Sequence, residues 1–171
     1  EDDYYLYRGS VVMDRRICKA LEVLAAEEIM AGYQYQVVAP YLAGMEREAI
    51  SEFLETTATD EVDDHFKKLQ QRMSELGYTP RTLFDFNSIS TLSRCEYVLV
   101  SSLTDLLPLM DRYIASEQCA IDHYMELIQL CGDSDPVTKR MAEEIMADEY
   151  EHHEGFSSFK ADLQTLIGNA D

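Results

Sequence analysis

The sequence predicts an all-α protein: an antiparallel four-helix bundle with one long crossover between helices two and three. Three observations predict it. Apolar residues recur at helical spacing in four long segments, alternating strand-like patterns are almost absent, and an irregular stretch separates the two halves of the chain. At 171 residues the chain fits one domain, taken as 1–171.

The first two helices form a predicted hairpin with a short turn. The first helix is expected over about 13–43, because its apolar residues keep helical spacing up to Gly44, which can end a helix. The second is expected over about 45–76 and stops at Gly77. After it, Pro80 and the segment "FNSISTLSR" break regular structure, so we expect a crossover over about 78–103. Such a connection is far longer than a bundle turn needs.

The last two helices form a second predicted hairpin. The third is expected over about 104–131, before Gly132. The fourth is expected over about 135–167 and has the clearest start signal in the chain, with Asp135 as the cap and Pro136 at the first helical position.

Composition excludes some classes of function. The 33 acidic and 14 basic residues give a net charge of −19. Binding nucleic acid requires clustered Lys and Arg, so no such partner is expected, whereas a negative chain attracts cations. No apolar run approaches ~18 residues, so no membrane span is predicted. The N-terminus "EDDYYLYRGS" is not a secretory signal, and the four cysteines are too sparse for a disulfide-stapled secreted domain. The predicted location is cytoplasmic.

The two hairpins repeat one pattern of acids and tyrosines. In "EIMAGYQY", Tyr35 follows Glu28 by seven residues, and in "EQCAIDHY", Tyr124 follows Glu117 by seven. Seven residues are two helical turns, so each Glu shares a face with its Tyr. The tyrosines fit two roles equally well: hydrogen-bond donors to carboxylates across the bundle, or ordinary core residues.

The partner helices supply further acids in register. Glu61 lies 33 residues after Glu28, and Glu149 lies 32 residues after Glu117. In "EYEHH", His152 comes one turn after Glu149. A bundle core with an acid from every helix needs cations, because burying unpaired carboxylates costs several kcal/mol each. Two divalent metal ions would satisfy that charge.

The second helix departs from this pattern. Asp64 stands three residues after Glu61, and His65 stands four after it. Glu61 and His65 still share a helix face. Alternatively, Glu61 and Asp64 bind the metal. Since imidazole suits transition metals, His65 is favoured and Asp64 is the alternative.

Over nearly its whole length the chain resembles the ferritin superfamily, in which Glu and Glu-x-x-His residues of a bundle hold two iron ions. "EIMAGYQY" and "DEYEH" are similar to bacterioferritin. "ELGYTP", "RCEY", "EQCAIDHY" and "SDPVTKRMAEEI" resemble the Dps-like branch, also called thioferritins. The residue after Glu61 is Val62, where bacterioferritin has its haem-ligating Met, so no haem is expected.

The resemblance implies the activity and the assembly. It implies two Fe ions per subunit, with Mn or Zn as alternatives, in a homo-oligomeric shell of 12 subunits. Within that shell the protein would act as a ferroxidase: Fe²⁺ is oxidised by hydrogen peroxide or O₂, and Fe³⁺ is stored, which protects against oxidative stress. The expected metal ligands, counted with the preferred histidine, are Glu28, Glu61, His65, Glu117, Glu149 and His152.

The resemblance also assigns Cys95 and Cys119 as a redox pair beside the metal site. The residues alone favour two small buried thiols, although the crossover is long enough to bring the two sulfurs together. Cys18 and Cys131 are interpreted as core residues. His123 and His153 lie off the ligand face, and for His123 we expect a solvent-facing or intersubunit position.

Two other functions fit the same residues. One is a di-iron or di-manganese peroxidase or oxidase that stores no mineral. The other is an acidic helical adaptor that binds a basic partner and no metal. Four inward acids in register disfavour the adaptor, because it has no use for them.

Overall fold

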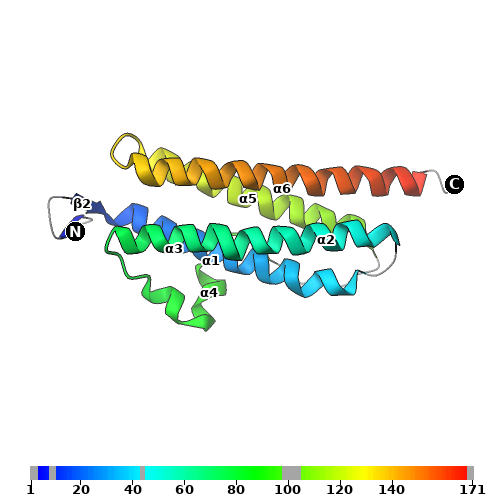
Figure 1. Ribbon diagram of the computed structural model, residues 1–171, viewed down its shortest axis with the longest axis horizontal. Coiled ribbons are helices and arrows are strands. Elements are labelled where there is room, and N and C mark those ends of the chain that lie inside the picture. Colours follow the sequence, from blue (N-terminus) through cyan, green and yellow to red (C-terminus); the bar gives the residue numbers. More distant parts are fainter. Residues whose placement is uncertain (1–3, 8–10, 43–44, 98–104, 169–171) are drawn as a thin grey trace.

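The computed structural model describes residues 4–7, 11–42, 45–97 and 105–168. Four long helices form an antiparallel bundle, so the predicted all-α class and its long crossover are confirmed (Figure 1). One element was not predicted. Strands β1 (Tyr4–Tyr7) and β2 (Val11–Asp14) pair as a small antiparallel hairpin before the bundle. The first helix therefore begins at Arg15, with the Asp14 side chain accepting a hydrogen bond from the Arg16 N–H.

The bundle consists of two helical hairpins. In Figure 1, α5 lies along α6, and α1 lies along the helix that begins with α2. That second helix is continuous but contains a π-helical segment, η2. Gly77 and Gly132 each follow the end of a helix and have positive φ angles, of 72° and 50°. Asp135 caps the last helix, because its carboxylate accepts a hydrogen bond from the Thr138 N–H. The bundle elements are α1 (Arg15–Val38), η1 (Ala39–Tyr41), α2 (Met45–Thr59), η2 (Asp60–His65), α3 (Phe66–Glu75), α5 (Leu106–Cys131) and α6 (Pro136–Gly168). Gly44, the predicted end of the first helix, lies outside the described residues.

The described part of the crossover packs against α1. It contains the short helices η3 (Arg81–Phe84) and α4 (Phe86–Leu92), and α4 projects from the bundle beside α1 (Figure 1). The buried Glu22 side chain fixes its start, since it accepts hydrogen bonds from the Tyr78 hydroxyl at 2.6 Å and from the Thr82 N–H at 3.0 Å. Residues 98–103 of the predicted crossover lie outside the described residues.

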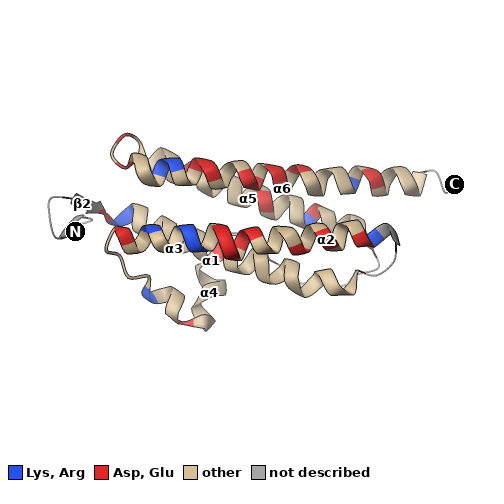
Figure 2. Cartoon of the chain, viewed as in Figure 1, with Lys and Arg blue, Asp and Glu red and all other residues tan. Residues whose placement is uncertain are grey.

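The core has two apolar parts with a polar layer between them. One part is built around Tyr35, Leu54 and Phe156, and the other around Leu21 and Leu69. Each fully buried Leu or Phe contributes about 1.5–3 kcal/mol, which lets the bundle tolerate a polar middle. Acidic residues recur along α6 and along the helix formed by α2, η2 and α3 (Figure 2). The layer between the two apolar parts contains the candidate site.

Candidate metal centre

Six buried side chains meet in the polar layer, and they are the six expected from the sequence. The α1 and α5 helices supply one carboxylate each, while η2 and α6 supply one Glu and one His each. All six are at most 6 % exposed: Glu28, Glu61, His65, Glu117, Glu149 and His152. The ligating atoms form two overlapping groups, and within each group they lie within 4.8 Å of one another. Glu61 and Glu149 belong to both groups.

The first group surrounds His65. Its Nδ1 atom lies 3.0 Å from Glu149 Oε1, 3.1 Å from Glu61 Oε2 and 3.6 Å from Glu28 Oε2. Three carboxylates therefore converge on one imidazole nitrogen, in a space with almost no solvent exposure. Asp64, the alternative ligand, has a half-exposed carboxylate that pairs with Lys68, and it groups with His65 and Asp148 but not with the buried glutamates. It is His65, and not Asp64, that the structure places in the cluster.

The second group surrounds His152. Its Nδ1 atom lies 3.4 Å from Glu61 Oε1, 3.8 Å from Glu149 Oε2 and 4.0 Å from Glu117 Oε2. Glu61 and Glu149 thus turn one oxygen toward each histidine. Because a carboxylate can bridge two metal ions through its two oxygens, this arrangement suits a pair of ions with two shared ligands.

The π-helical segment explains the unequal spacing of ligands on the two helices. In η2 the Phe66 N–H donates to the Glu61 carbonyl, five residues back, so the turn holds one residue more than an α-helical turn. Glu61 and His65, four apart, therefore take the relative positions that Glu149 and His152, three apart, take in regular α-helix. Periodicity analysis assumed a uniform α-helix and missed this segment. The sequence contained its signal, because the first hairpin has one residue more than the second, both from Glu to His (four against three) and from one helix's Glu to the next (33 against 32).

Two aspartates missed by the sequence analysis contact the outer edges of the histidines. His65 Nε2 lies 3.3 Å from Asp148 Oδ2, and His152 Nε2 lies 3.5 Å from Asp60 Oδ2. A carboxylate at the far nitrogen orients a metal-binding imidazole and makes it a stronger ligand. The signal was the repeated dipeptide Asp-Glu, since each aspartate directly precedes a glutamate of the cluster.

Two buried tyrosines reach across the bundle to the remaining carboxylates. The Tyr35 hydroxyl donates to Glu117 Oε1, and the Tyr124 hydroxyl donates to Glu28 Oε1. Each tyrosine thus contacts the glutamate of the opposite hairpin, and not the one on its own helix face. Of the two roles considered from the sequence, the structure places both tyrosines in the donor position.

The electrostatics of the cluster are those of a site that carries too much negative charge. Burial, together with the charges of Glu149 and Glu61, raises the pKa values of Glu28 and Glu117 well above the usual range. Burial alone would lower the pKa of His152, but Glu149 and Glu61 raise it to about 10. Protons thus supply the positive charge that the four carboxylates require, and metal ions can take the place of those protons.

Three ligand atoms of the cluster have no well-aligned hydrogen bond. Glu61 Oε1, Glu149 Oε1 and His152 Nδ1 are buried, and in the described chain they have only the ion-pair contacts within the cluster. A buried polar atom without a good hydrogen bond costs about 1–3 kcal/mol. Carboxylate oxygen and imidazole nitrogen are ligands that bind Fe²⁺, Mn²⁺ or Zn²⁺. The side chains therefore fit a pair of metal ions.

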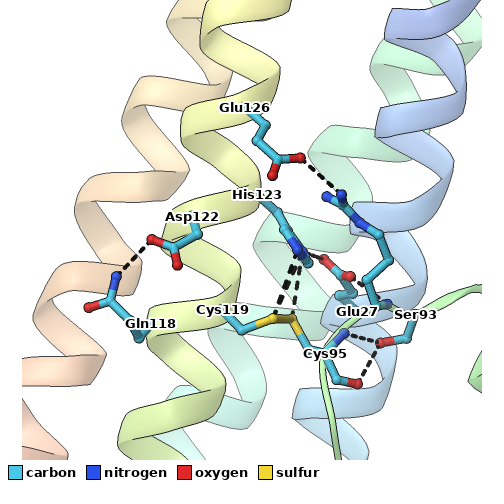
Figure 3. The surroundings of a disulfide bond; sticks show 9 residues. Glu27, Ser93, Cys95, Gln118, Cys119, Asp122, His123 and Glu126 are labelled. Atoms are coloured by element: carbon cyan, nitrogen blue, oxygen red, sulfur yellow. Dashed lines mark hydrogen bonds and ion pairs between the residues drawn. A yellow bond between two sulfur atoms is a disulfide. The ribbon is translucent and has the colours of Figure 1, made fainter.

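Cys95 and Cys119 form a disulfide that links the crossover to α5, with a Cα–Cα distance of 5.9 Å. Figure 3 shows the His123 imidazole beside this disulfide. His123 Nδ1 lies 3.7 Å from Cys95 Sγ and 2.9 Å from Glu27 Oε2. His123 is thus partly buried beside the disulfide, while the expected intersubunit position stays a prediction. Helical spacing correctly turned it away from the cluster, but the crossover covers the surface to which it points.

The other cysteines and the last histidine take no part in these groups. Cys18 and Cys131 are buried, and each is unpaired within the described chain. His153 is half-buried on α6, beside the buried His152. No helix in the described part of the chain is long and apolar enough to cross a membrane.

Comparison with known proteins supports the fold and the family. The profile of the ferritin-like domain matches residues 18–166. A "DNA protection during starvation protein" from Pyrococcus furiosus is 30% identical over 142 residues, which is 81% of this chain and 75% of that protein.

Solved structures share the architecture at low sequence identity. The di-iron bacterioferritin of Desulfovibrio desulfuricans superposes with a TM-score of 0.74 at 21% identity, over 88% of this chain and 81% of that one. A ferritin-like, di-iron carboxylate protein from Bacillus anthracis gives 0.68 at 20% identity, over 85% of this chain and 96% of that one. The domain match and the P. furiosus relative together show that this chain belongs to the ferritin superfamily, in its Dps-like branch.

Proposed function

We propose that this protein is a ferroxidase that oxidises Fe²⁺ with hydrogen peroxide or O₂ at the six-residue cluster and stores the Fe³⁺ in a homo-oligomeric shell. The single observation that carries the proposal is the arrangement of Glu61 and Glu149. Each belongs to both ligand groups, and each has one buried oxygen that faces a cluster histidine without a well-aligned hydrogen bond. Two adjacent cations would satisfy both oxygens.

Each residue has a role in binding the iron substrate. Glu28 and His65 hold one ion, Glu117 and His152 hold the other, and Glu61 and Glu149 contact both. Carboxylates suit this task because they bind both Fe²⁺ and Fe³⁺ as hard oxygen ligands. Asp148 and Asp60 hold the imidazoles with Nδ1 facing the ions, and the two tyrosines orient the terminal glutamates.

The electron balance explains why two ions are held together. One peroxide molecule accepts one electron from each of two Fe²⁺ ions and, with two protons, leaves as two water molecules. Two adjacent ions allow this two-electron reduction without releasing a hydroxyl radical. Consuming peroxide and Fe²⁺ together removes both reagents of radical chemistry, which accounts for a protective role against oxidative stress.

Stopped-flow absorbance after mixing the protein with Fe²⁺ and peroxide tests the ferroxidase proposal. The double variant Glu117→Ala, Glu149→Ala should lose rapid oxidation, since one shared and one terminal ligand are gone. Glu151→Ala is the matched control, because Glu151 is an exposed glutamate on the same helix. If the double variant oxidised iron as fast as the control, the cluster would not be the ferroxidase site.

Storage needs an enclosed volume, and the oligomeric state tests it separately. Light scattering coupled to size-exclusion chromatography should show a closed shell of about 12 subunits, as the Dps-like assignment favours. A monomer or dimer that still oxidised iron would contradict storage and leave a di-iron or di-manganese oxidase or peroxidase.

A further inference from the structure

A separate set of side chains that can bind metal lies outside the six-residue cluster, around the disulfide. It comprises Cys95 from the crossover, Cys119 and His123 from α5, and Glu27 from α1 (Figure 3). Glu27 is 1 % exposed; its carboxylate accepts a hydrogen bond from the Arg94 N–H and contacts the His123 imidazole, which lies beside the disulfide. We call these four residues the cysteine–histidine site.

We propose that, once the disulfide is reduced, the cysteine–histidine site binds one thiophilic divalent metal ion of the Zn²⁺ class. Two thiolates, one imidazole and one carboxylate make up a four-ligand set of the types that Zn²⁺ binds. This site is separate from the six-residue cluster, which contains no sulfur. It therefore adds a metal site to the proposed function and does not depend on it.

The distances already fit a tetrahedral ion. With Zn–S near 2.3 Å and Zn–N near 2.0–2.1 Å, sulfur and nitrogen ligands of one ion lie roughly 3.6 Å apart. His123 Nδ1 lies 3.7 Å from Cys95 Sγ and 4.0 Å from Cys119 Sγ. Reduction allows the two sulfurs to separate, and the 5.9 Å between their Cα atoms leaves room for both to face one ion.

Glu27 completes the four-ligand set. Its Oε1 atom accepts a hydrogen bond from the Arg94 N–H at 2.8 Å, which leaves Oε2 directed at the imidazole, 2.9 Å from His123 Nδ1. The carboxylate joins the ion through Oε2, beside the Nδ1 atom that binds it. In the oxidised protein the same carboxylate holds His123 against the disulfide, so the ligands stay in place for the reduced state.

The redox step balances with a dithiol as the reductant. The dithiol donates two electrons and two protons to the Cys95–Cys119 bond, which breaks into two thiols, while the dithiol becomes a disulfide. Binding of the ion then releases the two thiol protons to solvent. A cavity of ≈ 240 Å³ lined by His123, Arg94 and Leu127 opens beside the imidazole and gives an ion access from outside the bundle.

Cobalt titration of reduced, metal-free protein tests the proposal. Co²⁺ replaces Zn²⁺ and gives an intense thiolate-to-cobalt charge-transfer band only when it is bound to sulfur, so ions in the six-residue cluster do not contribute. With a phosphine as reductant, the intensity of the band at saturation should correspond to one sulfur-bound Co²⁺ per chain, and excess Zn²⁺ should abolish it. The oxidised protein should show no band. Absence of the band in protein whose two thiols have been shown to be free would overturn the proposal.

Variants test the ligand set. Cys95→Ser should abolish the band, and His123→Ala or Glu27→Gln should weaken Co²⁺ binding about tenfold or more. Cys18→Ser is the matched control, because Cys18 is a buried cysteine outside the site, and it should keep the full band. Unchanged Co²⁺ affinity in His123→Ala that folds normally by circular dichroism would contradict the assignment. The variant Glu117→Ala, Glu149→Ala should lose iron oxidation and keep the band, so the two proposals fail separately.

Discussion

In the first hairpin, a glutamate and a histidine four residues apart reach the cluster from a π-helical segment. In the second hairpin, the same pair is three residues apart and reaches it from regular α-helix. The outcomes match closely: each histidine turns Nδ1 inward and contacts an aspartate of the other hairpin through Nε2. The difference shows that the position of a ligand in space is set by the local turn, so equal spacing in sequence is not required.

The largest expected effect is a difference in stability between two single-residue deletions, one in α6 and one in η2. Deleting Glu151 from α6 rotates all following residues by about 100° and carries the buried Phe156 out of the core. Losing one such side chain costs about 3–5 kcal/mol, and several positions move, so this variant should not fold. Deleting Asp63 from η2 lets i→i+4 bonds replace i→i+5 bonds while the flanking helices keep their faces.

The free energy of unfolding of the Asp63 deletion should therefore stay within about 1 kcal/mol of the wild type. The exposed Asp63–Lys67 ion pair that it removes contributes little. Chemical denaturation followed by circular dichroism measures both deletions. If both deletions destabilised the protein equally, the wider turn of η2 would not be the place where the helix holds one additional residue.

A smaller effect is expected where α1 approaches the π segment. A Cβ atom on Gly32 would lie 2.5 Å from Val62 Cγ2 and 3.2 Å from the Ala58 carbonyl oxygen. Gly32→Ala should therefore destabilise the protein by about 1–3 kcal/mol, although alanine usually favours a helix. The corresponding position of the second hairpin, four residues after Glu117, holds a buried Ile121. Thermal unfolding measures the change, and a stabilised variant would show that η2 is not in close contact with α1.

The two aspartates behind the histidines should act alike despite the different helices. Asp148→Asn and Asp60→Asn should each weaken iron binding about 10- to 100-fold, because a neutral amide supports an imidazole ligand less well than a carboxylate does. Anaerobic Fe²⁺ titration measures the affinity, with the exposed Asp63→Asn as the control. A large loss in only one variant would mean that the two halves of the cluster are unequal.

The smallest effect concerns the cysteines near one end of the bundle, one from each hairpin. Burial raises the pKa of Cys18 to about 11 and that of Cys131 to about 12. Since the thiolate is the reactive form, both thiols should resist alkylation at pH 8 and react faster only as the pH rises toward those values. After reduction, mass spectrometry should find Cys95 and Cys119 modified first. Early modification of Cys18 alone would show that the first hairpin is the looser one.

The sequence predicted the bundle, the crossover and the six cluster residues because helical periodicity carries that information directly. The π segment went unpredicted although the unequal spacings indicate it, because Glu61 and His65 also share a face in an α-helix. The environment of His123 was missed for a different reason. Periodicity tells which way a side chain points, whereas the crossover that covers His123 is irregular and leaves no periodic signal. Strands β1 and β2 were missed because four-residue segments are too short to give a reliable alternating pattern.

The contacts that the tyrosines and aspartates make around the cluster run from one hairpin to the other. The tyrosine hydroxyls donate hydrogen bonds across the bundle, Tyr35 to Glu117 and Tyr124 to Glu28. The histidines pair with aspartates of the opposite hairpin, His65 with Asp148 and His152 with Asp60. Each hairpin thus supplies its own carboxylates and histidine but takes from the other hairpin the tyrosine and the aspartate that hold them. The orientation of the ligands therefore depends on the docking of the two hairpins, and a change that separates the hairpins disorders both halves of the cluster together.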